Sequence, residues 1–263
     1  MYNFEFEVNS VILNAPSCSN CAHFTTDSNC EPICPLMEQG KIRESYPAKV
    51  PCVGFGSCSE WKESETRKKL LKNLPFELSD DGKTLVSVND DAIEDLEQAI
   101  IPYGVEIIND DAFNCCTNLK NVFIPESVRK IGSSAFSDCS SLKEVQLPSS
   151  LEEIELGAFH HCTHLEKINI PAKVRVLDQL VFSDCLKLNT VIFSNIHIPF
   201  FKSNLEKICQ DAFMNCSSLR NIRLPKGLKT VERWAFRWCD PLPEGTLEFP
   251  EGCNVDDDIF DPE

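Results

Sequence analysis

The residues best suited to chemistry are six cysteines near the start of the chain. Four of them lie in CSNCAHFTTDSNCEPICP as two close pairs with two- and three-residue spacers, and two more follow in PCVGFGSCSEW. Two such pairs of thiolates can reach one tetrahedral zinc ion, because a short spacer lets both sulfurs of a pair point at the same centre. The predicted ligands of a structural zinc ion are Cys18, Cys21, Cys30 and Cys34, with Cys52 and Cys58 as alternatives.

Other chemistries fit the same thiols and stay open at this point. The cysteines could hold an iron–sulfur cluster, or they could form three disulfides, and His23 could replace one thiolate as a ligand. In the metal interpretation residues 1–60 form a small module whose coordination positions are all filled by protein, since so short a segment builds little apolar core.

The elements that would position any other functional group come from an internal repeat. Aligned phenylalanines recur in steps of 23, 23, 23, 31 and 23 residues, and six cysteines keep the same steps. A fixed period in the twenties with a Leu-x-x-Val-x-Leu-Pro core predicts a solenoid of stacked coils. The phenylalanines are Phe113, Phe136, Phe159, Phe182, Phe213 and Phe236, and the cysteines are Cys116, Cys139, Cys162, Cys185, Cys216 and Cys239.

Each repeat has the pattern of a short strand, a proline turn, a second short apolar step and a return that contains the phenylalanine. The strands should pair in parallel with their neighbours and bury columns of Leu, Val, Phe and Cys. A helix is expected over residues 61–74, the solenoid with its N-terminal cap over 75–250, and an acidic cap or tail over 251–263. The turn prolines are Pro125, Pro148, Pro171 and Pro225.

The string IPESVRKIGSSAFSDCSSLKEVQLPSSLEEIELGAF resembles the BspA-like, or Treponema-type, leucine-rich repeats. Ile-Pro, Val-x-x-Ile-Gly, Ala-Phe, Cys and Leu-x-x-Val-x-Leu-Pro follow one another within one period, and the likeness covers about residues 76–250. The resemblance implies a right-handed leucine-rich repeat solenoid with a parallel β-sheet on one face and short strands or turns on the other. It also implies a module that binds proteins, often at the surface of bacteria.

The charge balance argues against binding to nucleic acid or anionic membranes, and the lack of catalytic motifs argues against enzyme activity. A formal net charge of −16 opposes general attraction to phosphate backbones or anionic lipid. No P-loop, G-x-S-x-G, H-E-x-x-H or dinucleotide motif occurs, so we expect no enzyme activity. Without an export signal or an apolar run of about 18 residues, we expect a cytoplasmic protein if Met1 is the native start. A surface or secreted protein is the alternative if a signal was removed.

We therefore predict a non-enzymatic scaffold that binds a protein or peptide along the outward positions of the repeated strands. These positions combine apolar, amide and charged side chains, as protein interfaces do. A second candidate is the apolar insertion SNIHIPFFKSN, which either covers the adjacent repeat or forms a contact patch. The predicted partner-binding residues are Asn121, Phe123, Glu144, Gln146, Lys167, Asn169, Thr190, Ile192, Asn221 and Arg223, with Phe200 and Phe201 of the insertion.

Two further clusters are predicted to be structural. The repeat cysteines should be buried as small apolar side chains, with no electropositive neighbour to make them reactive. His160, His161 and His164 of FHHCTH occupy repeat positions that carry Asn, Ser, Asp or Cys elsewhere, which is typical of variable surface loops. The alternative function is a metal or redox module, formed by the cysteines between Cys18 and Cys58, that the repeats only position.

Overall fold

The computed structural model describes residues 75–102, 104–193, 203–239, 242 and 247–260, and four short strands before them. The chain divides into two compact units, Met1–Asn73 and Leu74–Glu263. In the first unit β1 pairs with β2 and β3 with β4, both antiparallel. These strands are β1 (Glu5–Val8), β2 (Val11–Asn14), β3 (Thr25–Thr26) and β4 (Pro32–Ile33). The predicted cysteine site and the helix expected over 61–74 lie outside the described residues.

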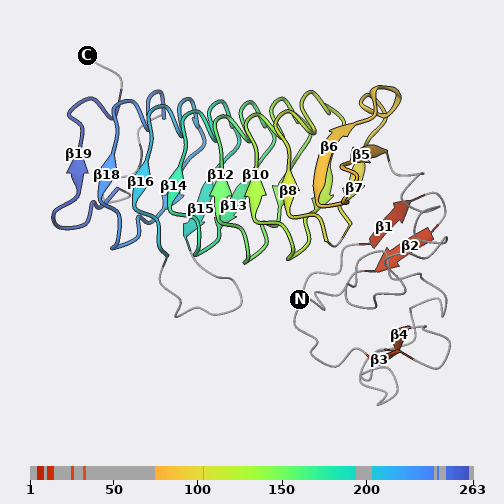
Figure 1. Cartoon of the computed structure of the whole chain (residues 1–263). Coiled ribbons are helices and arrows are strands. Elements are labelled where there is room, and N and C mark those ends of the chain that lie inside the picture. Colours follow the sequence, from red (N-terminus) through yellow and green to blue (C-terminus); the bar gives the residue numbers. More distant parts are fainter. Residues whose placement is uncertain are drawn as a thin grey trace. The chain divides into compact units, whose positions relative to one another are not determined.

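The second unit is a solenoid of stacked coils with parallel strands on two faces (Figure 1). The Leu-x-x-Val-x-Leu segments form one of them, which we call the LxxVxL face. Neighbouring strands pair in parallel, and a single bridge from Phe123 to Gln146 joins β9 to the segment of β11. The predicted parallel sheet is therefore confirmed. The strands are β7 (Gln98–Ile100), β9 (Asn121–Phe123), β11 (Glu144–Val145), β13 (Lys167–Ile170), β15 (Thr190–Phe193) and β17 (Asn221–Ile222).

The second apolar step of each repeat also forms strands, which make up the second face. They pair in parallel in two groups, β6-β8-β10-β12 and β14-β16-β18-β19, and β12 and β14 are not paired with each other. The strands are β6 (Thr84–Val88), β8 (Ile107–Ile108), β10 (Lys130–Ile131), β12 (Glu153–Ile154), β14 (Val176–Leu177), β16 (Lys207–Ile208), β18 (Thr230–Val231) and β19 (Asn254–Val255).

The turn between the two faces is set by proline. The carbonyl of Pro125 accepts a hydrogen bond from the amide of Val128, and the same bond recurs from Leu151 to Pro148 and from Leu228 to Pro225. Proline is the first residue of each of these turns, and because it has no backbone N–H it ends the preceding strand instead of extending the ladder of hydrogen bonds.

The six repeat phenylalanines form one stacked column through the interior. Neighbouring rings from Phe113 to Phe236 lie 4.9–5.6 Å apart, centroid to centroid, with interplanar angles of 5–18°. All six side chains are fully buried. Each coil thus covers the ring of the coil before it, which explains why one repeat alone could not form this core.

Both ends of the solenoid are capped. At the start, β5 (Phe76–Leu78) pairs antiparallel with β6 through a turn in which Gly82 has φ +67°. At the end, β19 pairs with β18, Ile259 is buried, and the ring of Phe260 lies 6.4 Å from that of Phe236 at 41°. The acidic segment up to Phe260 therefore forms the last coil of the solenoid.

Candidate protein-binding face

The predicted partner-binding residues of the LxxVxL strands lie side by side on one surface. In the parallel register Glu144 stands opposite Lys167, and Asn169 stands opposite Ile192. The side chains between them in sequence, such as Ile168, are buried, so the predicted alternation is confirmed. The structure adds one coil that the sequence analysis did not include, because Gln98 pairs with Asn121 and Ile100 with Phe123.

Most polar side chains of this face have no partner in the described part of the chain. Thr190 bonds to Asn189 at 2.7 Å and accepts a weak bond from Asn221 at 3.4 Å. Within the described residues, the other predicted polar side chains of the face make no side-chain hydrogen bond or ion pair, and the buried Oδ1 atom of Asn169 has no partner there. These residues are Asn121, Glu144, Gln146, Lys167, Asn169 and Arg223.

The second face, which was not predicted as a site, carries ion pairs between coils. Lys83 pairs with Glu106, Arg129 with Glu152, and Arg175 with Glu206, at 2.9, 3.1 and 2.9 Å. One position of the repeat therefore alternates in sign from coil to coil. The alternation is visible in the sequence at Lys83, Glu106, Arg129, Glu152, Arg175, Glu206 and Lys229 once the strands are known to be adjacent.

These pairs shift the ionisation of their partners in the expected direction. A hydrogen bond from Arg175, and then one from Lys229, lowers the pKa of Glu206. Lys173, followed by Arg129, lowers the pKa of Glu152. The side chains are largely exposed, so each pair contributes little to stability, but together they pair the charged groups at this one repeat position.

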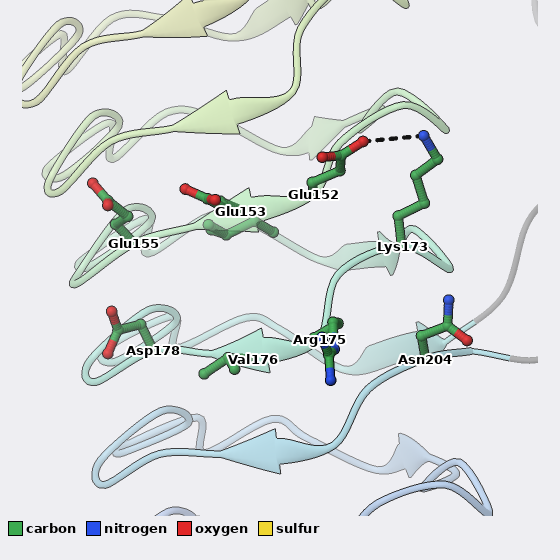
Figure 2. Close-up of a pocket in the computed structure, with 9 residues that line it drawn as sticks. Glu152, Glu153, Glu155, Lys173, Arg175, Val176, Asp178 and Asn204 are labelled. Carbon is green, nitrogen blue, oxygen red and sulfur yellow. Dashed lines mark hydrogen bonds and ion pairs between the residues drawn. The ribbon is translucent and has the colours of Figure 1, made fainter.

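A groove of about 630 Å³ opens on the second face where β12 and β14 are not paired (Figure 2). Glu155 and Asp178 lie at one end of the view, and Lys173, Arg175 and Asn204 lie at the other. An adjoining groove of about 490 Å³ shares Arg175 and Asn204 with it. The first groove is lined by Glu152, Glu153, Ile154, Glu155, Lys173, Arg175, Val176, Asp178 and Asn204.

The repeat cysteines are structural, and the structure adds a role for their protons. The thiol of Cys162 donates to the carbonyl oxygen of Phe136, one coil back, at 3.2 Å, and four other repeat cysteines make the equivalent bond at 3.1–3.2 Å. Burial raises the pKa of Cys139 and Cys162 well above the usual range and that of Cys116 to about 11. These thiols therefore stay protonated and poorly nucleophilic.

Two of the three histidines bond to neighbouring coils, whereas Nδ1 of His160 lies 3.7 Å from Asp184 and makes no hydrogen bond in the described part of the chain. The Nδ1 atom of His161 bonds to Asp138, which lowers the pKa of that carboxyl, and His164 bonds to the carbonyl of Ser140 at 2.8 Å. Within the described ranges, no three His, Cys, Asp or Glu side chains are placed to hold a metal ion. The predicted ligands Cys18 to Cys58, with Phe200 and Phe201 of the insertion, fall outside those ranges.

One exposed cluster near the end of the solenoid was also missed. The guanidinium of Arg237 lies 4.0 Å from the ring centre of Trp238, and that of Arg233 lies 4.4 Å from Trp234. Both tryptophans have positive φ, 60° and 55°, at positions where each of the six phenylalanine-containing repeats uses this conformation. The backbone geometry belongs to the repeat, so it does not mark a site by itself.

Among the described helices, none is long and apolar enough to cross a membrane.

Comparison with known proteins places the chain within one family. The model for the BspA type leucine-rich repeat region matches six copies, over residues 91–199 and 193–260. A leucine-rich repeat protein of Treponema pallidum is 31% identical with a TM-score of 0.59, over 70% of this chain and 83% of that one. One from Bacteroides ovatus is 25% identical with a TM-score of 0.46, over 62% and 48% of the two chains. No curated protein matches.

The matched repeats cover more than half of the chain, and the stacked coils and parallel faces described above are what such repeats build. The chain belongs to the BspA-type leucine-rich repeat family.

Proposed function

We propose that this protein is a non-enzymatic scaffold that binds a protein or peptide partner along the LxxVxL face. Leucine-rich repeat proteins generally act as interaction scaffolds. The observation that carries the proposal here is the contrast between the faces. Most polar side chains at the outward positions of the LxxVxL face lack a partner in the described part of the chain, although Lys120 pairs with Glu97 directly before β9 and β7. On the second face, one repeat position is used in ion pairs from coil to coil.

Unpartnered amides and charges beside half-buried apolar side chains are suited to recognition. Phe123 and Ile192 are partly exposed and lie three coils apart in one row, with Gln146 and Asn169 on the two coils between them. A partner that covers this row would bury two apolar anchors and satisfy the amides between them, which is the composition of a protein interface.

A photo-crosslinking residue at Gln146 tests the proposal with the full chain in its native host. Crosslinked proteins are identified by mass spectrometry, and the partner is then expressed and titrated. The double variant Phe123→Asp, Ile192→Asp should weaken its binding about 100-fold, because both apolar anchors would carry a charge that the complex must desolvate. The far-ultraviolet circular dichroism should be unchanged.

The matched control puts the same charges on the second face. Ile107 and Leu156 are exposed by 37% and 41%, so Ile107→Asp, Leu156→Asp changes the net charge equally without touching the LxxVxL face. That variant should bind normally. Equal losses in both double variants, or normal binding by the first, would remove the LxxVxL face from the proposal.

The N-terminal cysteines support a second candidate, a metal or redox module that the repeats position. Two close pairs of thiols remain a fair match to one tetrahedral ion. We expect about one zinc per chain in protein purified without added metal, measured by elemental analysis. Coloured protein with iron would indicate a redox cluster instead, and loss of all free thiols from the segment would indicate disulfides.

A further inference from the structure

The second face contains a recurring pair of a lysine and a carboxylate in successive coils. The ammonium of Lys130 lies 2.7 Å from Glu155, and that of Lys207 lies 2.6 Å from Glu232. Both lysines are the first residue of a strand, and both glutamates directly follow the strand of the next coil. The fold thus has a defined place for a side-chain cation beside a carboxylate of the following coil.

At the junction of β12 and β14 this place holds a carboxylate instead. Adding one 23-residue step to Lys130 and Glu155 gives Glu153 and Asp178 (130 + 23 = 153; 155 + 23 = 178). Lys130 stands beside Glu153 in the β10–β12 register, but its ammonium is bonded to Glu155. Neither Glu153 nor Asp178 has an ion-pair partner in the described part of the chain.

The groove described above opens at this junction. Val176 lies in the middle of the labelled side chains in Figure 2 and is exposed by 41%, so the groove has an apolar element between its charged ends. The two cations at the end of the groove opposite Asp178 are already in ion pairs, since Lys173 pairs with Glu152 and Arg175 with Glu206. The uncompensated charge of the groove is therefore negative.

We propose that a basic segment of a partner protein binds in this groove. A lysine or arginine of the partner takes the place that Lys130 and Lys207 occupy in sibling coils, with its charge between Glu153 and Asp178 and its methylenes against Val176. The net charge of −16 favours a cationic partner and opposes a second copy of the chain. This proposal does not depend on the LxxVxL face.

The test uses the full chain, labelled with ¹⁵N, and the blocked peptide GKVKVKG as a probe. Chemical shift changes on titration should be concentrated at the amides of Val176, Asp178 and Glu153. Glu153→Lys rebuilds the lysine–carboxylate pair of the sibling coils, so it should fold and should weaken peptide binding about tenfold through loss of attraction and occupation of the site.

Matched variants separate this site from general attraction to an acidic protein. Glu144→Lys makes the same charge change on the LxxVxL face, and it should weaken peptide binding less than about twofold. Asp178→Asn should weaken it more than Asp257→Asn, which alters the exposed final coil.

Three results would overturn the proposal. Equal losses in Glu153→Lys and Glu144→Lys would show unspecific attraction. Shift changes at the acidic residues of the first coil, which include Asp90, Asp91, Glu94 and Asp95, would place the probe elsewhere. A titration with Ca²⁺ that moves the same amides at lower concentration than the peptide would identify a cation site rather than a peptide groove.

Discussion

The two faces of the solenoid are built from the same repeat, yet they use their polar side chains differently. On the second face, charges alternate along one position and pair across coils, as Arg129 does with Glu152. On the LxxVxL face, Glu144 and Lys167 stand in register without forming an ion pair, and the amides of Gln146 and Asn169 have no hydrogen-bond partner among the described residues. Both faces join the coils through paired strands, but ion pairs between coils are concentrated on the second face, whereas most outward polar side chains of the LxxVxL face have no partner among the described residues.

The largest expected effect is the loss of stability when a buried side chain is truncated, and it tests whether the two faces share one hydrophobic core. Ile168 under the LxxVxL face and Leu177 under the second face are each buried to 1% exposure or less. Replacing either by alanine should lower the free energy of unfolding by about 3 kcal/mol, because each leaves a cavity in the shared interior. Urea denaturation followed by circular dichroism measures the change. A loss in only one variant would mean that the faces are stabilised independently.

Reversing one charge on each face should change the melting temperature differently on the two faces, and this effect is smaller than that of the core substitutions. Arg129→Glu would place three carboxylates in successive coils, with Glu106 and Glu152, and should lower the melting temperature by about 2–4 °C at low salt. Arg223→Glu makes the same charge change on the LxxVxL face, where no ion pair is lost, and should change it by less than about 1 °C. Half-molar salt should remove the difference. Equal shifts would contradict the conclusion that ion pairs between coils are concentrated on the second face.

Acidification should act mainly through the second face. The pKa of Glu206 is lowered by Arg175 and Lys229, so its ionised form stabilises the fold above the unfolded value of 4.5. That contribution is lost as pH falls through the lower, folded value. Glu206→Gln should therefore be less stable than the parent at pH 7, and the difference should be smaller at pH 3. A constant difference at both pH values would show that the charge of Glu206 is not the cause.

The smallest effect on stability is expected on the LxxVxL face. Gln146→Ala and Asn169→Ala remove side chains that make no hydrogen bond in the described structure, and each should change the free energy of unfolding by less than about 0.5 kcal/mol. A loss above 1 kcal/mol would mean that these amides hold the coils together, which would end the distinction between the two faces.

Much of the fold could be predicted from the sequence because the repeat is a property of spacing. The phenylalanine column and the burial of residues such as Ile168 follow from the 23-residue period and from strand alternation. The Treponema-type resemblance is confirmed by the family match. The face formed by Asn121 to Arg223 could be placed for the same reason, although the additional coil at Gln98 was not recognised.

Features that depend on contacts between coils could not be predicted in the same way. The bond from Cys162 to the carbonyl of Phe136 requires the direction of the thiol and the backbone of another coil. The groove beside Val176 requires that β12 and β14 fail to pair, and the spacing of 23 residues is unchanged at this junction. The period fixes which residues are neighbours, but it does not fix their hydrogen bonds.

The final coil determines how an array of this kind can change in length. Phe260 meets Phe236 at 41°, whereas rings inside the column are nearly parallel, and Ile259 is buried beside it. A seventh stacked ring has no flat surface to continue from at that end. Duplication of a 23-residue unit between Phe113 and Phe236 would insert a ring between two matched neighbours, so such proteins can be lengthened from within while keeping the same closing coil.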